Sequence, residues 1–216
     1  MHRPALLFDL DGTLVDSAHG IAVALTRQLR ARGGDAIEIA RVRSLVSLGV
    51  DTLVREALGS HFRNADEDVS EFRAALTTIA ADPASIFPGV IAALSELARY
   101  GYPMAIVTNK PERLARQLIA QLDLERFFPA VVGGDTLAVC KPDPAPLLHA
   151  RQLLTEGDGA IMIGDSKVDA HAAAAAASPF LLYQAGYGKD ECAFVASEHR
   201  FTDFGELPAL IARHAG

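Results

Sequence analysis

Short apolar runs, most of them followed by Gly, Asp or Thr, recur along the chain and alternate with helical patterns. Apolar runs of this length, bounded by turn-forming residues, predict buried strands. The five predicted strands are residues 5–8, 103–108, 130–135, 160–165 and 180–183. Apolar positions at helical spacing predict helices over residues 91–101, 111–122 and 144–154. Strands that alternate with helices imply parallel βαβ units, so we expect an α/β fold with a doubly wound parallel sheet.

The segment from Ser17 to Asp82 departs from this alternation. Its helical patterns lie at residues 21–34, 50–59 and 69–81, and no convincing strand separates them. A connection of about 65 residues is far longer than a βαβ crossover needs, so we interpret it as an all-helical cap inserted after the first strand. The alternative is that these helices cover the sheet. The predicted domains are a catalytic core of residues 1–16 and 83–216 and a cap of residues 17–82, joined through a Pro- and Gly-containing hinge at 81–89.

Composition narrows the possible classes of function. Half of the 216 residues are hydrophobic and 22% are charged, which excludes a disordered polar chain. No apolar run approaches the roughly 20 residues that span a bilayer, and a net charge of −7 argues against a nucleic-acid partner. Two cysteines, Cys140 and Cys192, without CxxC or HExxH patterns indicate neither a disulfide framework nor a zinc site. We expect a cytoplasmic protein, monomeric or homodimeric, that does not bind membranes.

Polar residues follow four of the predicted strands. In an open parallel sheet, ligands bind beyond the carboxyl ends of the strands, where the strand order reverses. Any one of these residues alone is more often a turn former or a helix N-cap, but four such strand ends together indicate a site. The candidates are Asp9 and Asp11, Thr108 and Asn109, Asp135 with Lys141, and Asp165 with Ser166 and Asp169.

These residue types match the requirements of phosphoryl transfer. That reaction needs a nucleophile, an acid/base, oxygen ligands for a hard divalent ion, and donors for the phosphate oxygens. Several carboxylates without histidine or cysteine partners suit Mg²⁺. Asp9 and Asp11 would point the same way from an extended chain, so a bound cation would also offset their mutual repulsion.

Four motifs in the sequence resemble those of the haloacid dehalogenase superfamily of phosphatases, in the family's order. They are DLDGTLVDS at 9–17, VTNK at 107–110, VCKPDP at 139–144 and GDSKVD at 164–169. The longer stretches FPGVIAALSELARYGYPMAIVTNKP and VVGGDTLAVCKPDPAPLLHA resemble the phosphoglycolate phosphatase subgroup. The resemblance implies a Rossmann-like core with a helical cap, a Mg²⁺ cofactor and a phosphomonoesterase that acts through an aspartyl phosphate.

By this resemblance, Asp9 is the nucleophile and a Mg²⁺ ligand. Asp11 would protonate the leaving alkoxide, then activate water, while its backbone carbonyl binds the metal. An acidic residue at this position favours a phosphatase over a dehalogenase. The turn at Gly12 and Thr13 would turn its N–H groups toward phosphate oxygens, although a plain turn is the alternative.

The resemblance also implies roles for the later motifs. Thr108 would donate its hydroxyl to the phosphate beside Asn109, or cap the next helix. Lys141 would neutralise Asp9 and the phosphate, whereas Lys110 is expected at the surface. Asp165 would bind Mg²⁺ directly, and Asp169 would bind it through water or orient Lys141. Ser166 would assist there or cap the next helix, and Cys140 is expected to be a packed thiol.

Substrate choice is expected to lie in the cap. The segment Ala40–Val54 resembles the cap loop that reaches the active site in phosphoglycolate phosphatases, with Ser47 where glycine is usual. Arg43 would pair with a substrate carboxylate, or else be a solvated helix residue. The implied substrate is a small phosphorylated metabolite, 2-phosphoglycolate. The alternatives are a sugar-phosphate phosphatase or mutase with the same catalytic residues, and more remotely a signalling receiver domain or a non-catalytic binding module.

Overall fold

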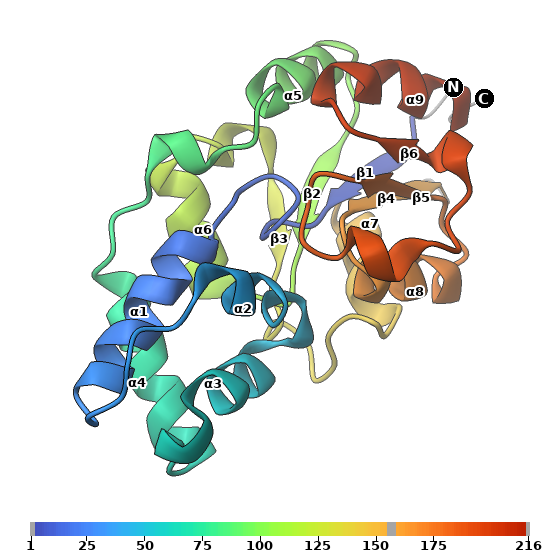
Figure 1. The fold of residues 1–216 in the computed structure, drawn as a ribbon. Helices are drawn as coiled ribbons and strands as arrows, with labels where there is room; N and C mark the ends of the chain where they lie inside the picture. Colours follow the sequence, from blue (N-terminus) through green and yellow to red (C-terminus); the bar gives the residue numbers. More distant parts are fainter. Residues whose placement is uncertain (1–2, 155–158, 215–216) are drawn as a thin grey trace.

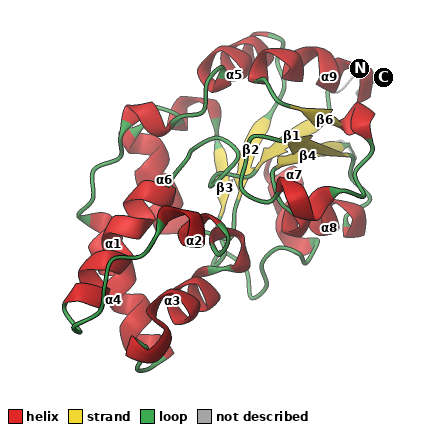
Figure 2. Cartoon of the chain, viewed as in Figure 1, coloured by secondary structure: helices red, strands yellow, loops and turns green. Residues whose placement is uncertain are grey.

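The protein, seen here in a computed structural model that describes residues 3–154 and 159–214, is built around a parallel sheet with helices on both faces (Figures 1 and 2). The strands are β1 Ala5–Phe8, β2 Met104–Val107, β3 Ala130–Val132, β4 Ala160–Gly164, β5 Phe180–Tyr183 and β6 Arg200–Phe201. The helices are α1 Ala18–Arg30, α2 Ile39–Arg43, α3 Val50–Leu58, α4 Ala65–Thr77, α5 Val90–Arg99, α6 Glu112–Gln121, α7 Ala145–Leu154, α8 Lys167–Ala175 and α9 Leu207–His214.

The predicted fold class is confirmed. The strand order is β3-β2-β1-β4-β5-β6, and every neighbouring pair is parallel. Each of the five predicted strands is present, but those predicted at 103–108, 130–135 and 160–165 are one to three residues shorter, spanning 104–107, 130–132 and 160–164. The sequence pattern does not predict β6, because a two-residue strand that includes Arg200 presents no apolar run.

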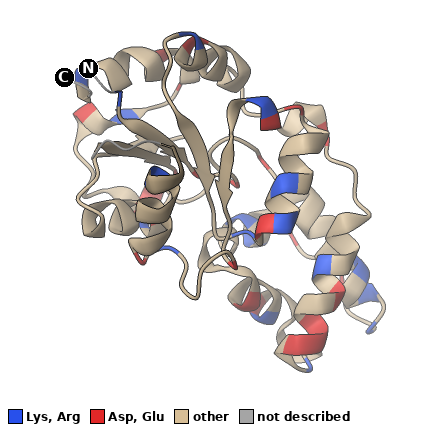
Figure 3. Cartoon of the chain, turned by 180° about the vertical axis from the view of Figure 1, so that it is seen from behind, with Lys and Arg blue, Asp and Glu red and all other residues tan. Residues whose placement is uncertain are grey.

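Side chains that alternate along the strands build one apolar cluster on each face of the sheet. In β1, Leu6 and Phe8 pack with residues of α5, α6 and α9, whereas Leu7 faces the opposite way and packs with α7 and α8. The strands β1 to β5 contain no charged residue, and Figure 3 shows the charges on the helices and loops around them. Burial on both faces explains why these strands read as continuous apolar runs.

Residues 17–82, all of which the structure describes, contain helices and turns only. Their buried apolar residues form a third cluster, which includes Leu25, Val54 and Phe72. The chain enters and leaves this segment side by side, since Val15 forms an antiparallel bridge with Ile86. A separate apolar cluster and adjacent ends support the predicted division into core and cap, which stays a prediction. The short helix α2 lies in the part of the chain that resembles a cap loop, and the apolar pattern does not predict it, although Arg43 as a solvated helix residue was one of the two alternatives.

No helix within the described part of the chain is both long and apolar enough to cross a membrane.

A close backbone contact at the end of β3 generates a stability prediction. A Cβ atom on Gly134 would lie 2.4 Å from the backbone oxygen of Asn109, while the Gly134 N–H donates to the Lys110 oxygen at 2.9 Å. We expect Gly134→Ala to lower the free energy of unfolding by about 1–3 kcal/mol, because backbone must move to admit the methyl group. Urea denaturation with a fixed m-value would measure this loss.

A matched substitution in α1 serves as the control. A Cβ on Gly20 would meet no heavy atom closer than 3.7 Å. Gly20→Ala should therefore raise the stability by up to about 1 kcal/mol, since alanine is the better helix former. Equal stabilities of the two variants would contradict the close contact inferred at Gly134.

Candidate active site

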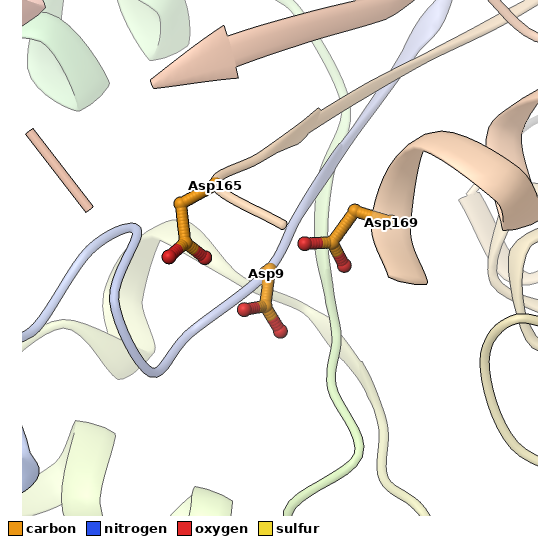
Figure 4. A group of neighbouring side chains, drawn as sticks. All are labelled: Asp9, Asp165 and Asp169. Carbon is orange, nitrogen blue, oxygen red and sulfur yellow. The ribbon is translucent and has the colours of Figure 1, made fainter. Parts of the chain in front are cut away.

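Three buried carboxylates meet where the strand order reverses. The chain passes from β1 outward to β3 and then returns to place β4 on the other side of β1. Asp9 directly follows β1, Asp165 directly follows β4, and Asp169 lies in the first turn of α8. Their carboxylates point toward one another (Figure 4), and ligand atoms of all three lie within 4.8 Å of one another. The switch point thus carries the chemistry, as expected for an open parallel sheet.

The ammonium group of Lys141 pairs with two of these carboxylates. Its Nζ lies 2.8 Å from Asp9 Oδ1, 2.6 Å from Asp169 Oδ1 and 2.7 Å from the Val107 carbonyl oxygen. An ammonium has three N–H donors, so each is used. Burial alone would lower the pKa of Lys141, but the carboxylates of Asp169 and Asp9 outweigh it and raise the pKa above its ordinary value. Lys141 is therefore held as a cation.

Asp165 and Asp169 are also fixed by local hydrogen bonds. Asp165 accepts from the Thr13 hydroxyl at 3.1 Å and from the Tyr187 and Gly188 N–H groups at 2.6 and 3.3 Å. Asp169 forms a capping box with Ser166, whose hydroxyl and N–H lie 2.7 and 3.1 Å from Asp169 Oδ2. One oxygen of Asp169 therefore caps α8 while the other orients Lys141, and Ser166 is the helix cap that the sequence offered as an alternative.

Negative charge exceeds positive charge in this cluster, since three carboxylates face the single ammonium of Lys141. Burial raises the pKa of Asp9 to about 7; Lys141 opposes this rise and Asp169 adds to it. Burial, followed by repulsion from Asp169 and Asp9, raises the pKa of Asp165 to about 8. A divalent cation would relieve this repulsion, and a buried set of carboxylate oxygens fits a hard ion such as Mg²⁺. The residues present therefore fit the expected metal.

Asp11 is paired with Lys110, which corrects the expectation that Lys110 lies at the surface. The ammonium lies 3.0 and 3.1 Å from the two carboxylate oxygens of Asp11, and the side chains are only 9% and 8% exposed. Ser17, the residue before α1, also donates its hydroxyl to Asp11. The Lys110 backbone is fixed as well, since its N–H donates to Thr108 Oγ1 and its oxygen accepts from Gly134.

The turn at Gly12 and Thr13 differs from the expectation that its N–H groups face phosphate. The Gly12 N–H donates to the Val15 oxygen at 2.9 Å, and the Thr13 N–H donates weakly to the Leu10 oxygen at 3.4 Å. The turn closes on itself, so these donors are directed inward. Gly12 adopts φ +91°, and a Cβ there would lie 2.6 Å from Asp165 Oδ2. Glycine is needed for this close approach.

Thr108 and Asn109 lie beside the cluster at the end of β2. Thr108 is buried and does not cap α6, whose N-cap position is Pro111. The side-chain amide of Asn109 donates to the Lys141 backbone oxygen at 2.9 Å. Asn109 therefore anchors the loop that delivers Lys141.

Arg43 was expected at the substrate, but the structure does not bring it to the carboxylate cluster. Its guanidinium lies 2.6 Å from Asp16, with the side chain 47% exposed, and 5.8 Å from the centre of the Tyr187 ring. The Tyr187 hydroxyl also donates to Asp16 at 2.6 Å. These groups connect the helical segment to the loop whose backbone holds Asp165.

Two small cavities surround these groups. One, of about 20 Å³, is lined by Asp9, Asp11, Thr108, Asn109, Lys110, Lys141, Ser166, Val168 and Asp169, with Val46 and Ser47 from the expected cap loop. A second, of about 30 Å³, shares Asp11, Asn109, Lys110 and Val46 and has a mainly apolar wall. A larger cavity of about 270 Å³ between α1, α4 and α6 also reaches Lys110.

Sequence reasoning missed Lys110 and Tyr187 at the site. Lys110 lies three residues after the end of β2 and two after Thr108, so its position in the sequence already indicated that it lies near the site. Tyr187 lies in the loop after β5. Ligands bind beyond the carboxyl ends of strands in an open parallel sheet, and this expectation, applied to β5 as well, would have indicated Tyr187. Cys140 is exposed, contrary to the expected packed thiol, because the loop before Lys141 lies on the surface.

Comparison with known proteins agrees with this geometry. The family model of haloacid dehalogenase-like hydrolases matches residues 4–177. Phosphoglycolate phosphatase of Rhodobacter capsulatus is 38% identical over 214 residues, covering 96% of this chain and 96% of the relative. A plasmid-encoded phosphoglycolate phosphatase of Cupriavidus necator is 39% identical over 213 residues, covering 96% and 92%. These relatives confirm the predicted class of enzyme, a phosphoric monoester hydrolase.

Solved structures show the same fold. A protein of Haemophilus somnus, described as a predicted phosphoglycolate phosphatase, superposes with a TM-score of 0.83 at 24% identity over 96% of this chain and 97% of its own. A predicted phosphatase of Clostridium acetobutylicum superposes with a TM-score of 0.81 at 25% identity over 99% and 100%. The chain therefore belongs to the haloacid dehalogenase-like hydrolases.

Proposed function

We propose that this protein is a Mg²⁺-dependent phosphomonoesterase that hydrolyses 2-phosphoglycolate to glycolate and phosphate through a phosphoaspartate at Asp9. The observation that supports this most is the pairing of two differently held aspartates. Asp9 lies among buried carboxylates beside Lys141, whereas Asp11 is held by Lys110 and Ser17. The substrate is inferred from the relatives named phosphoglycolate phosphatase.

The contacts of Asp9 suggest which of its atoms attacks. Asp9 Oδ1 accepts the hydrogen bond from Lys141, so Oδ2 is the proposed attacking oxygen. Its attack on phosphorus breaks the bond to the ester oxygen, and Asp11, which must take up a proton before this step, gives that proton to the departing alkoxide. Asp11 then takes a proton from water, which attacks phosphorus and breaks the bond to Asp9. Phosphate leaves, and both carboxyl groups return to their starting states.

The remaining residues bind and orient. Lys141 would balance charge on Asp9 and the transferring phosphate, and the Thr108 hydroxyl would donate to a phosphate oxygen. Mg²⁺, held by Asp9, Asp165 and the backbone carbonyl of Asp11 with Asp169 nearby, would supply positive charge that polarises the phosphate.

The size of the cavities implies movement of the helical segment. The cavity beside Asp9 is small, about 20 Å³, so we expect the helical segment to move away when an ester binds. The helical segment is joined to the sheet at Val15 and Ile86, which lie side by side in an antiparallel bridge. The segment would open by rotating about this connection. Closure would then exclude water from the reaction. The partner is expected to be a small phosphorylated metabolite; the cytoplasmic location and the monomeric or homodimeric state stay predictions.

Phosphate release tests the reaction directly. We expect hydrolysis of 2-phosphoglycolate with Mg²⁺, little hydrolysis in EDTA, and a fall in kcat of at least about 10³-fold for Asp9→Asn, which lacks a nucleophilic oxyanion. Asp135→Asn is the matched control, because Asp135 follows β3 but accepts from the Glu112 N–H at 2.7 Å. It should retain activity. Full activity of Asp9→Asn, or none on any phosphate ester, would refute the mechanism.

Metal binding should depend on pH in a defined direction. Without metal, the pKa values of about 7 for Asp9 and about 8 for Asp165 exceed their ordinary value of 3.8. The unfolded chain therefore loses these protons first, and each group's contribution to stability is lost as pH rises toward its folded pKa. In EDTA, Asp165→Asn should gain stability relative to wild type between about pH 5 and pH 8.

Added Mg²⁺ should reverse the stability difference between wild type and Asp165→Asn. Thermal unfolding should show a larger rise in Tm for wild type near pH 8 than near pH 5, because protons compete with the ion at low pH. Asp165→Asn should respond less. A Mg²⁺ response that is equal at both pH values, or equal in the variant, would argue against these carboxylates as the metal site.

A further inference from the structure

We propose that Lys110 recognises the negative charge of the leaving group, and so selects phosphate esters whose alcohol carries a carboxylate one carbon away from the ester oxygen. This inference rests on the proposed function and adds to it the residue that determines substrate class. It moves the expected carboxylate contact from Arg43 to a lysine that had been expected at the surface.

The surroundings of Lys110 make it suited to bind an anion. Its side chain is 9% exposed, yet it lines both small cavities. Both contacts found for its ammonium within the described part of the chain are with Asp11, so one of three N–H donors is available. Its backbone is held to Thr108 and Gly134, which fixes the base of the side chain.

The other cations are engaged elsewhere. Lys141 uses its three donors on Asp9, Asp169 and the Val107 oxygen. Arg43 pairs with Asp16 and lines neither small cavity. Of the described residues that line these two cavities, Lys110 is thus the cation with a donor to spare.

The covalent structure of the substrate places its carboxylate near this donor. In 2-phosphoglycolate a single methylene group separates the carboxylate from the ester oxygen. Asp11 must lie within hydrogen-bond reach of that oxygen to protonate it, and Lys110 Nζ lies 3.0 Å from Asp11. A carboxylate one carbon from the ester oxygen would therefore come within reach of the Lys110 ammonium, which can donate to it and balance its charge.

The rest of the second cavity opposes sugar substrates. Its wall includes Val50, Leu53, Phe72 and Leu76, and its polar residues are Asp11, Asn109 and Lys110. Sugar hydroxyls buried against this wall would lose hydrogen bonds to water without replacement. A short acid, with its charge on Lys110 and its methylene against the wall, leaves fewer polar groups unpaired.

Two esters of equal length separate charge recognition from catalysis. We would measure kcat/KM for 2-phosphoglycolate and for 2-hydroxyethyl phosphate, in which CH₂OH replaces the carboxylate. Lys110→Met should lower the preference for 2-phosphoglycolate by about 10- to 100-fold, because a charge-assisted hydrogen bond is lost. Both rates should also fall, since Asp11 loses its partner. Lys110→Arg should restore most of the preference, because it retains the positive charge.

Arg43→Ala is the control, because Arg43 was first expected to bind the substrate carboxylate. It should affect kcat/KM for both esters equally. The ratio of the two rates is internal to each preparation, so loss of folded protein cancels. The inference would be overturned if Lys110→Met lowered kcat/KM equally for both esters, or if Arg43→Ala lowered it selectively for 2-phosphoglycolate. Hydrolysis of 2-phosphoglycolate by the wild type would still support the proposed function in that case. If wild type hydrolyses neither ester, the proposed function fails and the inference fails with it.

Discussion

A single buried ammonium group, that of Lys141, holds the active-site end of the sheet together. It contacts Asp9 after β1, the Val107 carbonyl of β2 and Asp169 of α8. Burying a charge in this way is tolerated only when each of its donors is paired, and here all three are. The contact therefore fixes the relative positions of two strand ends and a helix. It also leaves the cluster with excess negative charge, which is the physical reason that a divalent cation fits there.

Small residues allow this arrangement to be compact. A Cβ on Gly164 would lie 2.6 Å from the Asp169 carboxylate carbon, so only glycine at the end of β4 leaves room for that side chain. On the buried face of α8, Ala172 and Ala173 join the apolar cluster beneath β4 and β5. Because these side chains are short, the helix lies close to the sheet, and its first turn brings Asp169 to Lys141. Packing and chemistry are thus set by the same few positions.

Much of the fold and the central cluster could be predicted from the sequence. Strands buried on both faces give continuous apolar runs. Asp9 and Asp165 directly follow neighbouring parallel strands, so they lie close together whatever conformation the loops adopt. The details that were missed depend on side-chain partners. Lys110 and Arg43 are both cations near polar motifs, and the choice between Asp11 and Asp16 as partner is made by three-dimensional position. The direction of the Gly12 N–H depends on turn closure, which the motif letters do not encode.

The adjacent entry and exit of the helical segment have a consequence for the history of such proteins. Val15 and Ile86 lie in one bridge, so the intervening helices form a closed excursion from the sheet. Such an excursion can be lengthened, shortened or exchanged without changing strand order or displacing Asp9 and Asp165. One lineage could therefore change the apolar wall that the insertion contributes, which includes Val50, Leu53 and Phe72, while Lys110 and the catalytic carboxylates stay in place.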